Sequence, residues 1–237
     1  MQDSIGFLGL GHLGLPMATH LLDAGYPLRV FNRTVDKAAP LVARGAQLAT
    51  GPADVATPGG VVVSVVWDDA ALEAVVRDGL PERLGAGGVH VAMSTVLPAT
   101  SRRLAALHAQ HGATYVEAPI FGRPEAAAAR QLWIPIAGPA AAKARVRPIL
   151  EAMGAQGIFD FGDEVGAANV VKLVGNMLII SAARSLHEGL TLAEKAGCDP
   201  AQVLAMLTET LFSAPIYRNY GKMIVAKAPT MATSSIP

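Results

Sequence analysis

The chain has 237 residues, of which 51% are hydrophobic and 16% are charged. This length and composition predict one large or two modest globular domains and exclude a disordered chain. Lysine plus arginine equals aspartate plus glutamate at 19 each, so the overall charge gives no reason to expect a nucleic acid or an anionic membrane as partner.

A glycine-rich turn near the beginning of the chain separates an apolar run from a segment with helical spacing. It reads Gly9-Leu10-Gly11-His12-Leu13-Gly14. In the dinucleotide fingerprint the first glycine allows a tight turn, the second lets the backbone approach a pyrophosphate, and the third lets the helix pack on the strand. The start of the helix also favours an anion. We therefore expect these six residues to bind a cofactor; the alternative is an ordinary strand-turn-helix that uses glycine only for packing.

The end of the second predicted strand, 28–31, carries no acid. A site for NAD usually has Asp or Glu there, because a carboxylate accepts hydrogen bonds from the ribose hydroxyls. Here Asn32 would not repel a 2′-phosphate, Arg33 offers a planar fork of donors, and Thr34 adds a hydroxyl. These residues predict NADP(H) in preference to NAD(H), unless Arg33 is only a solvated charge and Asn32 only a turn residue.

Strand and helix patterns then alternate. We expect strands at 61–67, 89–93, 114–116, 132–137 and 158–161, and helices at 70–77, 101–111 and 140–153, the last interrupted or kinked by Pro148. This order predicts an α/β fold with a doubly wound, Rossmann-type, mostly parallel sheet over residues 1–164.

Ligands of such sheets bind at the carboxyl ends of the strands. The loops after Leu8, Phe31, Trp67, Met93 and Val116 should therefore face one cleft. This places Val66 and Trp67 among the expected cofactor contacts, although strand packing is the simplest role for both Trp67 and Trp133.

From residue 165 the pattern is helical. A long run ends at Gly197, and Asp199-Pro200 should cap a further helix over 201–211. We expect an all-helical second domain over residues 165–237. One long and one short helix cannot bury a core alone, so the missing surface should come from the first domain or from a partner subunit, most simply in a homodimer through these helices.

Lys172 stands among valines and leucines near the start of the long helix. An ammonium group in apolar surroundings is costly unless it is paired or partly neutral. Asn176 lies four residues on and shares its face. Such a pair, pointing into a cofactor cleft, can donate to a carbonyl oxygen as hydride reaches the carbon. A lysine that snorkels at a helix end fits the same pattern.

Several segments, taken in order, resemble one known family. They are Gly9 to Gly14 with Met17; Asn32-Arg33-Thr34; Met93-Ser94-Thr95-Val96; Glu117-Ala118-Pro119 with Gly122; Gly166 with Lys172 and Asn176; and Leu192 to Gly197. The resemblance is to the β-hydroxyacid dehydrogenase superfamily, which includes 3-hydroxyisobutyrate dehydrogenases and glyoxylate or succinic semialdehyde reductases and has the imine reductases as relatives. It implies that Lys172 is the catalytic acid/base, that Asn176 positions it or the substrate, and that Ser94, Thr95 and Val96 line the nicotinamide side.

The substrate loop departs from that family, which commonly has Asp-Ala-Pro-Val-Ser-Gly-Gly where this chain has Glu117 to Arg123. Phe121 removes a hydroxyl that would help to hold a substrate carboxylate. Arg123 replaces a glycine and either grips an acid or faces solvent. Together with Ser94 and Gly122 these are the expected substrate contacts. Gly175 also replaces one of two paired asparagines, and the chain stops before helices with which family members close the pocket, so either the sequence is truncated or its pocket is incomplete.

The leading hypothesis is an NADPH-dependent oxidoreductase that transfers hydride between nicotinamide and a small carbonyl or β-hydroxyacid substrate. Lys172 favours carbonyl over imine chemistry, because imine reductases usually replace this lysine. An imine reductase is the alternative, and an NADP(H)-binding protein without catalysis is the second alternative.

The remaining candidates have simpler explanations. His108 and His111 share a helix face without a third ligand, so we expect a solvated surface and no metal. Asp68-Asp69 should cap the following helix. Cys198 is the only cysteine, no signal peptide is recognised, and the apolar stretches 60–67 and 170–183 are too short or interrupted to span a bilayer. These features predict a cytoplasmic protein.

Overall fold

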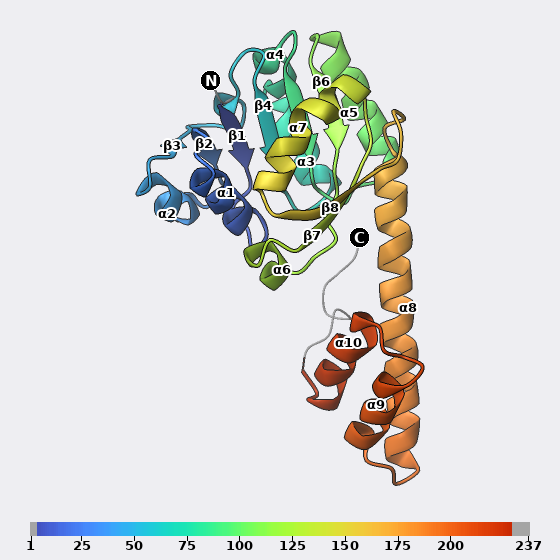
Figure 1. The fold of residues 1–237 in the computed structure, drawn as a ribbon. Coiled ribbons are helices and arrows are strands. Elements are labelled where there is room, and N and C mark those ends of the chain that lie inside the picture. The colour runs from blue at the N-terminus through green and yellow to red at the C-terminus, as the bar shows by residue number, and fades with distance from the viewer. Residues whose placement is uncertain (1–3, 229–237) are drawn as a thin grey trace. The chain divides into compact units, whose positions relative to one another are not determined.

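The computed structural model describes residues 4–228 (Figure 1). The chain divides into two compact units, Met1–Lys172 and Leu173–Pro237. The division falls inside helix α8 (Ala167–Lys195), whereas the sequence pattern changes before this helix begins, at residue 165.

The first unit contains a six-stranded parallel sheet. Its strands, in the order β3-β2-β1-β4-β5-β6, are Gln47–Leu48, Leu28–Phe31, Ile5–Leu8, Val61–Ser64, Val89–Ala92 and Thr114–Glu117. The strand order reverses between β1 and β4, as in the doubly wound dinucleotide-binding fold. The predicted Rossmann-type α/β class is therefore confirmed.

Two further strands form a sheet of their own. β7 (Leu132–Ile136) pairs in parallel with β8 (Ala155–Asp160), and antiparallel bridges join Ala137 to Glu117 and Trp133 to Phe121. The segment that follows β6 is thereby held against β7, so the substrate loop predicted from the sequence has a fixed backbone at Phe121.

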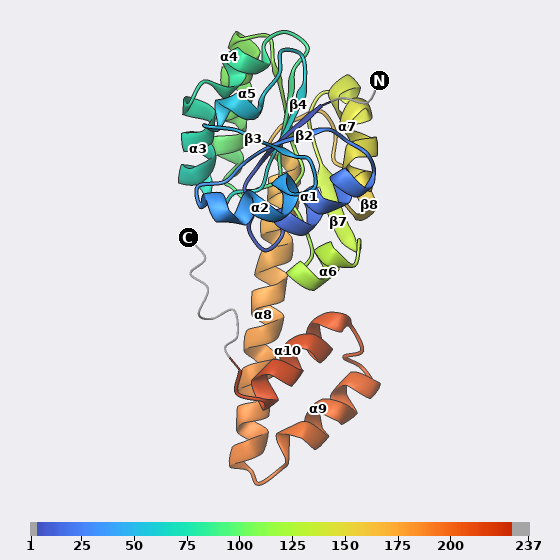
Figure 2. The same ribbon diagram turned by 90° about the vertical axis from the view of Figure 1, so that its left-hand side faces the viewer.

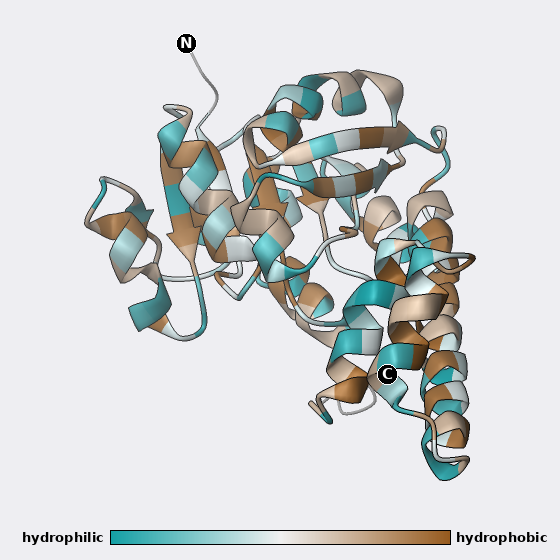
Figure 3. Ribbon diagram, turned by 60° about the horizontal axis from the view of Figure 1, so that its bottom comes forward, coloured by the Kyte–Doolittle hydropathy of each residue, from teal (hydrophilic) through white to brown (hydrophobic). Residues whose placement is uncertain are grey.

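Helices cover both faces of the large sheet (Figure 2). On one face lie α1 (Gly14–Asp23) and α7 (Ala140–Ala152), which bury Met17, Leu21, Val146 and Leu150 against alternate strand residues such as Phe7 and Val63. On the other face lie α3 (Asp69–Arg77), α4 (Leu80–Leu84) and α5 (Pro98–Gln110), which bury Leu72, Leu80 and Leu104. Both faces of the strands are thus apolar, as Figure 3 shows in brown. The short elements are η1 (Val35–Ala38), α2 (Ala39–Val42), η2 (Ala53–Val55) and α6 (Pro124–Ala128).

Of the two outcomes expected at Pro148, an interruption or a kink, the interruption is wrong, because α7 continues through this residue. A proline inside a helix costs about 3 kcal/mol, because it removes one hydrogen bond and crowds the preceding turn. Val146, Ile149 and Leu150 on the same helix are buried, and each full burial contributes about 1.5–3 kcal/mol. Packing on the sheet therefore outweighs the local preference.

The second unit contains the rest of α8, α9 (Pro200–Glu209) and α10 (Pro215–Val225). The Asp199 side chain accepts a hydrogen bond from the Ala201 N–H at 3.0 Å, which confirms the predicted cap. Helix α10 was not predicted. A small cluster of Leu186, Leu190 and Leu204 joins these helices, while Val174, Met177, Leu178 and Leu192 on α8 stay exposed.

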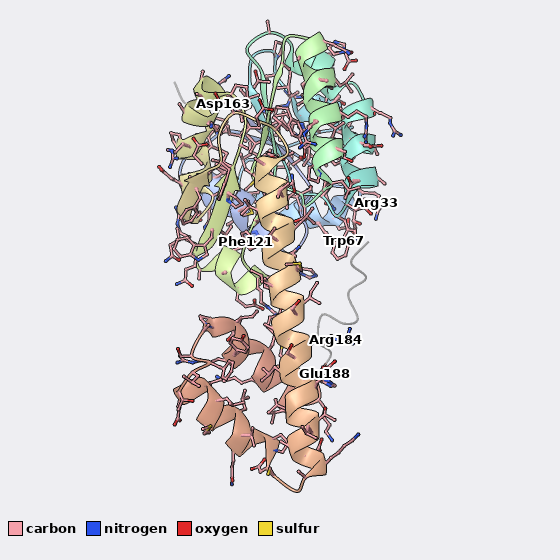
Figure 4. The ribbon with its side chains drawn as sticks, turned by 90° about the vertical axis from the view of Figure 1, so that its right-hand side faces the viewer. Arg33, Trp67, Phe121, Asp163, Arg184 and Glu188 are labelled. Atoms are coloured by element: carbon pink, nitrogen blue, oxygen red, sulfur yellow. The ribbon has the colours of Figure 1, made fainter. Side chains whose placement is uncertain are left out.

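Helix α8 corrects the expectation that the apolar stretch 170–183 is too short or too interrupted to span a bilayer, because the stretch is part of a longer helix. It has 29 residues and an 18-residue window of mean hydropathy 1.2, so it qualifies by length and composition alone. The helix extends beyond both ends of the apolar stretch 170–183. It also carries an exposed ion pair between Arg184 and Glu188, at 2.9 Å (Figure 4).

Candidate cofactor and catalytic site

The three glycines of the turn meet different surroundings. Gly9 has a positive φ of 91°, and a Cβ there would lie 2.1 Å from the Val65 carbonyl oxygen. A Cβ on Gly14 would lie 1.9 Å from the Gly9 carbonyl oxygen, whereas a Cβ on Gly11 would meet no atom within 4 Å. Gly9 and Gly14 are therefore needed for folding, whereas Gly11 borders open space. Among the intervening residues, Leu10 is buried, Leu13 is half-buried and His12 is exposed.

Asn32 fastens this turn to the end of β2. Its Oδ1 accepts a hydrogen bond from the Leu10 N–H at 2.8 Å, and its Nδ2 donates to the Thr34 carbonyl at 2.8 Å. Arg33 and Thr34 are exposed, and within residues 4–228 the Arg33 guanidinium has no hydrogen bond or ion pair. Figure 4 shows Arg33 at the margin of the first unit. The amide of Asn32 is thus occupied locally, while the donors of Arg33 remain free for an anion.

The loops after β4 and β5 are joined by a buried serine. The Ser94 hydroxyl accepts a hydrogen bond from the Val66 N–H at 3.0 Å, and the neighbouring Thr95 is half-buried. The prediction that Trp67 packs within a strand is wrong. This residue is 74% exposed, because β4 ends three residues earlier, at Ser64. The same prediction is correct for Trp133, whose ring lies over Gly157 and 5.9 Å from the Phe159 ring.

Lys172 and Phe121 meet in the first unit. The Lys172 Nζ lies 4.2 Å from the centroid of the Phe121 ring. The lysine is half-buried, and this burial lowers its pKa from 10.5 to about 8. Within residues 4–228 no carboxylate pairs with it. The ammonium group therefore faces an aromatic ring instead of an acid, and Asn176 follows one turn later, in the second unit.

The other substrate-loop candidates have separate surroundings. Gly122 has a φ of 155°, and a Cβ there would lie 2.5 Å from a methyl group of Leu132. The Arg123 side chain is 51% exposed, and its Nε lies 3.6 Å from the Glu125 carboxylate. Of the two alternatives for Arg123, the half-exposed position next to an acid favours solvent.

A buried carboxylate fixes the beginning of α8. Glu117 Oε1 accepts from the N–H groups of Gly166 and Ala168 at 2.7 and 2.8 Å, and its Oε2 accepts from Asn169 Nδ2 at 2.9 Å. Asn169 Oδ1 accepts in turn from the Val96 N–H at 3.1 Å. The first N–H groups of a helix lack partners within the helix and carry partial positive charge, so an anion there is stabilised. The helix that carries Lys172 is thereby tied to the segment after β5 and to the end of β6.

The sequence alone does not reveal this network. Asn169 belongs to none of the motifs above, and Glu117 belongs only to the segment that resembles the family's substrate loop. The signal in the sequence is an acid at the end of a strand and an asparagine in the first turn of a predicted helix. This signal is weak, because the sequence does not show that the two side chains are in contact.

His108 is fully buried, so the expected solvated surface is wrong for it. Its Nδ1 donates to the Leu104 carbonyl at 2.7 Å, and its Nε2 lies 3.0 Å from His90 Nδ1. His90 Nε2 lies 2.8 Å from the Ser64 hydroxyl. Burial lowers the pKa of both histidines. The physical reason is that α5 packs this face on the sheet, mainly on β6, where His108 lies against Tyr115 of β6 and His90 of β5.

The remaining polar candidates are structural. His111 stays partly exposed, with its Nε2 at 3.2 Å from Glu82. Asp68 caps α3 through the Ala71 N–H at 2.8 Å, as expected, and Asp69 accepts from the Leu97 N–H at 3.0 Å. Among residues 4–228 no three histidine, cysteine or acidic side chains are grouped so that they could hold a metal ion.

Residues 4–175 match the family described as the NAD binding domain of 6-phosphogluconate dehydrogenase. The chain is 40% identical over 222 residues to an uncharacterized oxidoreductase, YfjR, of Bacillus subtilis, covering 93% of this chain and 77% of that protein. It is 36% identical over 211 residues to 3-hydroxyisobutyrate dehydrogenase of Pseudomonas aeruginosa, covering 88% and 70%. The structure of an imine reductase from Streptomyces aurantiacus aligns with a TM-score of 0.79 and 27% identity over 98% of this chain and 81% of that one.

Proposed function

The chain belongs to the 6-phosphogluconate dehydrogenase family, and we propose that it reduces a small carbonyl compound with NADPH. Within this family it is an oxidoreductase that uses a nicotinamide cofactor, and it resembles the 3-hydroxyisobutyrate dehydrogenases and the imine reductases. The observation that carries the proposal is Lys172. It is half-buried, has no acidic partner among the described residues, and has a pKa lowered to about 8. A lysine with these properties is a suitable general acid at neutral pH.

The described residues fit a dinucleotide with a 2′-phosphate. The open space at Gly11 lies at the start of α1, whose N–H groups favour a pyrophosphate. Arg33 and Thr34 are exposed at the end of β2, and the position of the usual acid is taken by Asn32, whose side chain holds the glycine turn. These features support NADP(H) over NAD(H).

Cofactor choice is tested by Arg33→Ala. A hydrogen bond to a charged group contributes about 1.5–3 kcal/mol, so NADPH affinity should fall roughly 10- to 100-fold while NADH affinity changes little. Arg77→Ala, at another exposed arginine, is the control. Equal losses for both cofactors would contradict the role of Arg33.

When bound, the reduced nicotinamide supplies a hydride to the carbonyl carbon. Lys172 donates a proton from Nζ to the carbonyl oxygen as negative charge develops there, and the neutral amine then recovers a proton from water. Glu117 and Asn169 hold the first turn of α8 and so keep the lysine in place. We assign the positioning of the lysine or the substrate on the following turn to Asn176, and contacts to nicotinamide and substrate to Ser94 and Thr95.

The reaction is tested by NADPH oxidation with a panel of small aldehydes, oxoacids and imines. Lys172→Ala should reduce turnover by orders of magnitude while NADPH affinity stays nearly unchanged. Trp67 and Trp133 are the only tryptophans, so energy transfer from tryptophan to bound NADPH measures that affinity. Loss of the energy-transfer signal in Trp67→Phe, but not in Trp133→Phe, would place Trp67 near the cofactor. Retained turnover in Lys172→Ala would refute the assigned mechanism.

Imine reduction is the second candidate. The observation that favours it is Phe121, whose ring lies next to Lys172. The ring offers no hydroxyl to hold a substrate carboxylate, and an imine without a charged group does not need one. A cyclic imine turned over faster than glyoxylate and succinic semialdehyde would select this reaction. Tight NADPH binding without turnover of any carbonyl or imine would instead support a non-catalytic binding protein.

We also propose a homodimer through the helices of the second unit. Met177, Leu178 and Leu192 are 57%, 59% and 70% exposed, and a second copy would remove such surface from water. Sedimentation without detergent should give twice the chain mass, and Leu178→Glu should give the monomer. A requirement for detergent would favour a membrane instead. Cytoplasmic location stays part of the proposal.

A further inference from the structure

Phe121 has a firmly held backbone. Its N–H donates to the Trp133 carbonyl at 2.8 Å, and its carbonyl accepts from the Trp133 N–H at 3.0 Å. The preceding Ile120 is buried, and the following Gly122 adopts a φ of 155° against Leu132. The ring is therefore presented by a fixed segment, and a substitution at this position changes the side chain more than the path of the loop.

The ring is the described group that covers the Lys172 ammonium. Nζ lies 4.2 Å from the ring centroid, a distance at which the negative face of an aromatic ring attracts a cation. Such a ring offers no conventional hydrogen-bond acceptor, and among residues 4–228 no oxygen takes a hydrogen bond from Nζ. The ring thus restricts where the ammonium lies, yet leaves its three N–H donors for an oxygen outside the protein.

The same ring decides what can stand beside the reacting carbonyl. This step rests on the proposed function, in which Nζ donates to the carbonyl oxygen. A substituent on the carbonyl carbon then lies within a few ångströms of Nζ, and because Nζ itself lies 4.2 Å from the ring centroid, a substituent turned toward Phe121 contacts the ring. A carboxylate there would lose water against the ring and would compete with the carbonyl oxygen for the ammonium, whereas a hydrocarbon group would pack on the ring.

We propose that Phe121 is a positioning and specificity-determining residue, whose ring holds the Lys172 ammonium and selects uncharged carbonyl compounds with hydrocarbon substituents over oxoacids. The nearby Arg123 does not reverse this preference, because its guanidinium lies by Glu125 and half of its side chain is in solvent.

The experiment compares isobutyraldehyde with glyoxylate, since an isopropyl group and a carboxylate have the same number of heavy atoms. The ratio of kcat/KM with NADPH should favour isobutyraldehyde by at least about tenfold, equivalent to 1.4 kcal/mol. Phe121→Ser should reduce that ratio about tenfold, mainly through a lower KM for glyoxylate. Phe159→Ser, at a ring that is 52% exposed on β8, is the matched control and should leave the ratio unchanged.

A second variant separates the ring from its volume. Phe121→Leu keeps an apolar side chain but removes the negative ring face, so the ammonium loses stabilisation and the pKa seen in the pH profile of kcat should fall by about half a unit. This readout remains available if the serine variant does not fold, and a merely space-filling ring would not produce it.

The outcomes distinguish a wrong role for Phe121 from a wrong proposed function. Oxidation of NADPH with a preference for glyoxylate, or with a ratio that Phe121→Ser leaves unchanged, overturns this inference and leaves the proposed function intact. Binding of NADPH without oxidation by either aldehyde or by the rest of the carbonyl and imine panel overturns both.

Discussion

The pH dependence of reduction follows from the lowered pKa of Lys172. With a pKa of about 8, roughly nine tenths of the lysine is protonated at pH 7 and roughly one tenth at pH 9. Because reduction needs the protonated form, its rate should fall about tenfold over this interval. The reverse reaction needs the neutral amine and should accelerate through the same range. An ordinary lysine, with a pKa near 10.4, would lose only a few per cent of its protonated form between pH 7 and pH 9.

The assay is single-turnover oxidation of NADPH at saturating carbonyl substrate, from pH 6 to pH 10. Single turnover excludes product release, which would flatten the profile if it were slow. Lys172→Arg is the control, because a guanidinium stays protonated throughout and its residual rate should not fall. A wild-type rate that stays constant up to pH 9.5 would refute the lowered pKa, the role of Lys172 as the acid, or both.

Three further predictions concern buried groups. Lys172→Met should raise the free energy of unfolding at pH 7 by about 1–3 kcal/mol, because a protonated amine that is half-buried destabilises the folded state. Urea titration measures this gain, and its absence would mean that the amine is well solvated. Glu117→Gln should cost about 1–3 kcal/mol and lower kcat more than NADPH affinity, since one helix cap is weakened; equal losses would point to general unfolding. The free energy of unfolding should decrease as pH falls below about 6.5, because the unfolded chain binds protons at His90 and His108 while the folded protein, with lowered pKa values, does not. The double variant with leucine at both positions should lack this decrease in acid unfolding curves.

The parts of the fold that the sequence predicted depend on short-range patterns. The strand, glycine turn and helix around Gly11 follow from spacing within about 20 residues, and the cap at Asp199 follows from two adjacent residues. Trp67 was misjudged because an apolar run does not reveal where its strand ends. His108 was misjudged because helical spacing identifies a face but not what covers it. Helix α10 was missed, although its apolar residues pack in the small core of the second unit.

The candidate site was predicted in part for the same reason. Lys172 was recognised from its apolar neighbours together with the family resemblance. Its contact with Phe121 joins residues far apart in the chain, as does the hydrogen bond between Asn169 and Val96. Such contacts depend on the register of the parallel strands and on the antiparallel bridges that follow β6, neither of which a single sequence specifies.

The glycine turn separates two kinds of requirement. A methyl group at Gly9 or Gly14 would collide with main-chain oxygen, so the protein itself forbids it. At Gly11 the same methyl would touch nothing in the chain and would need no unusual backbone angle. Gly11→Ala should therefore leave the melting temperature unchanged but impair nucleotide binding. Any evolutionary pressure to keep glycine at this position then comes from the ligand and not from the fold.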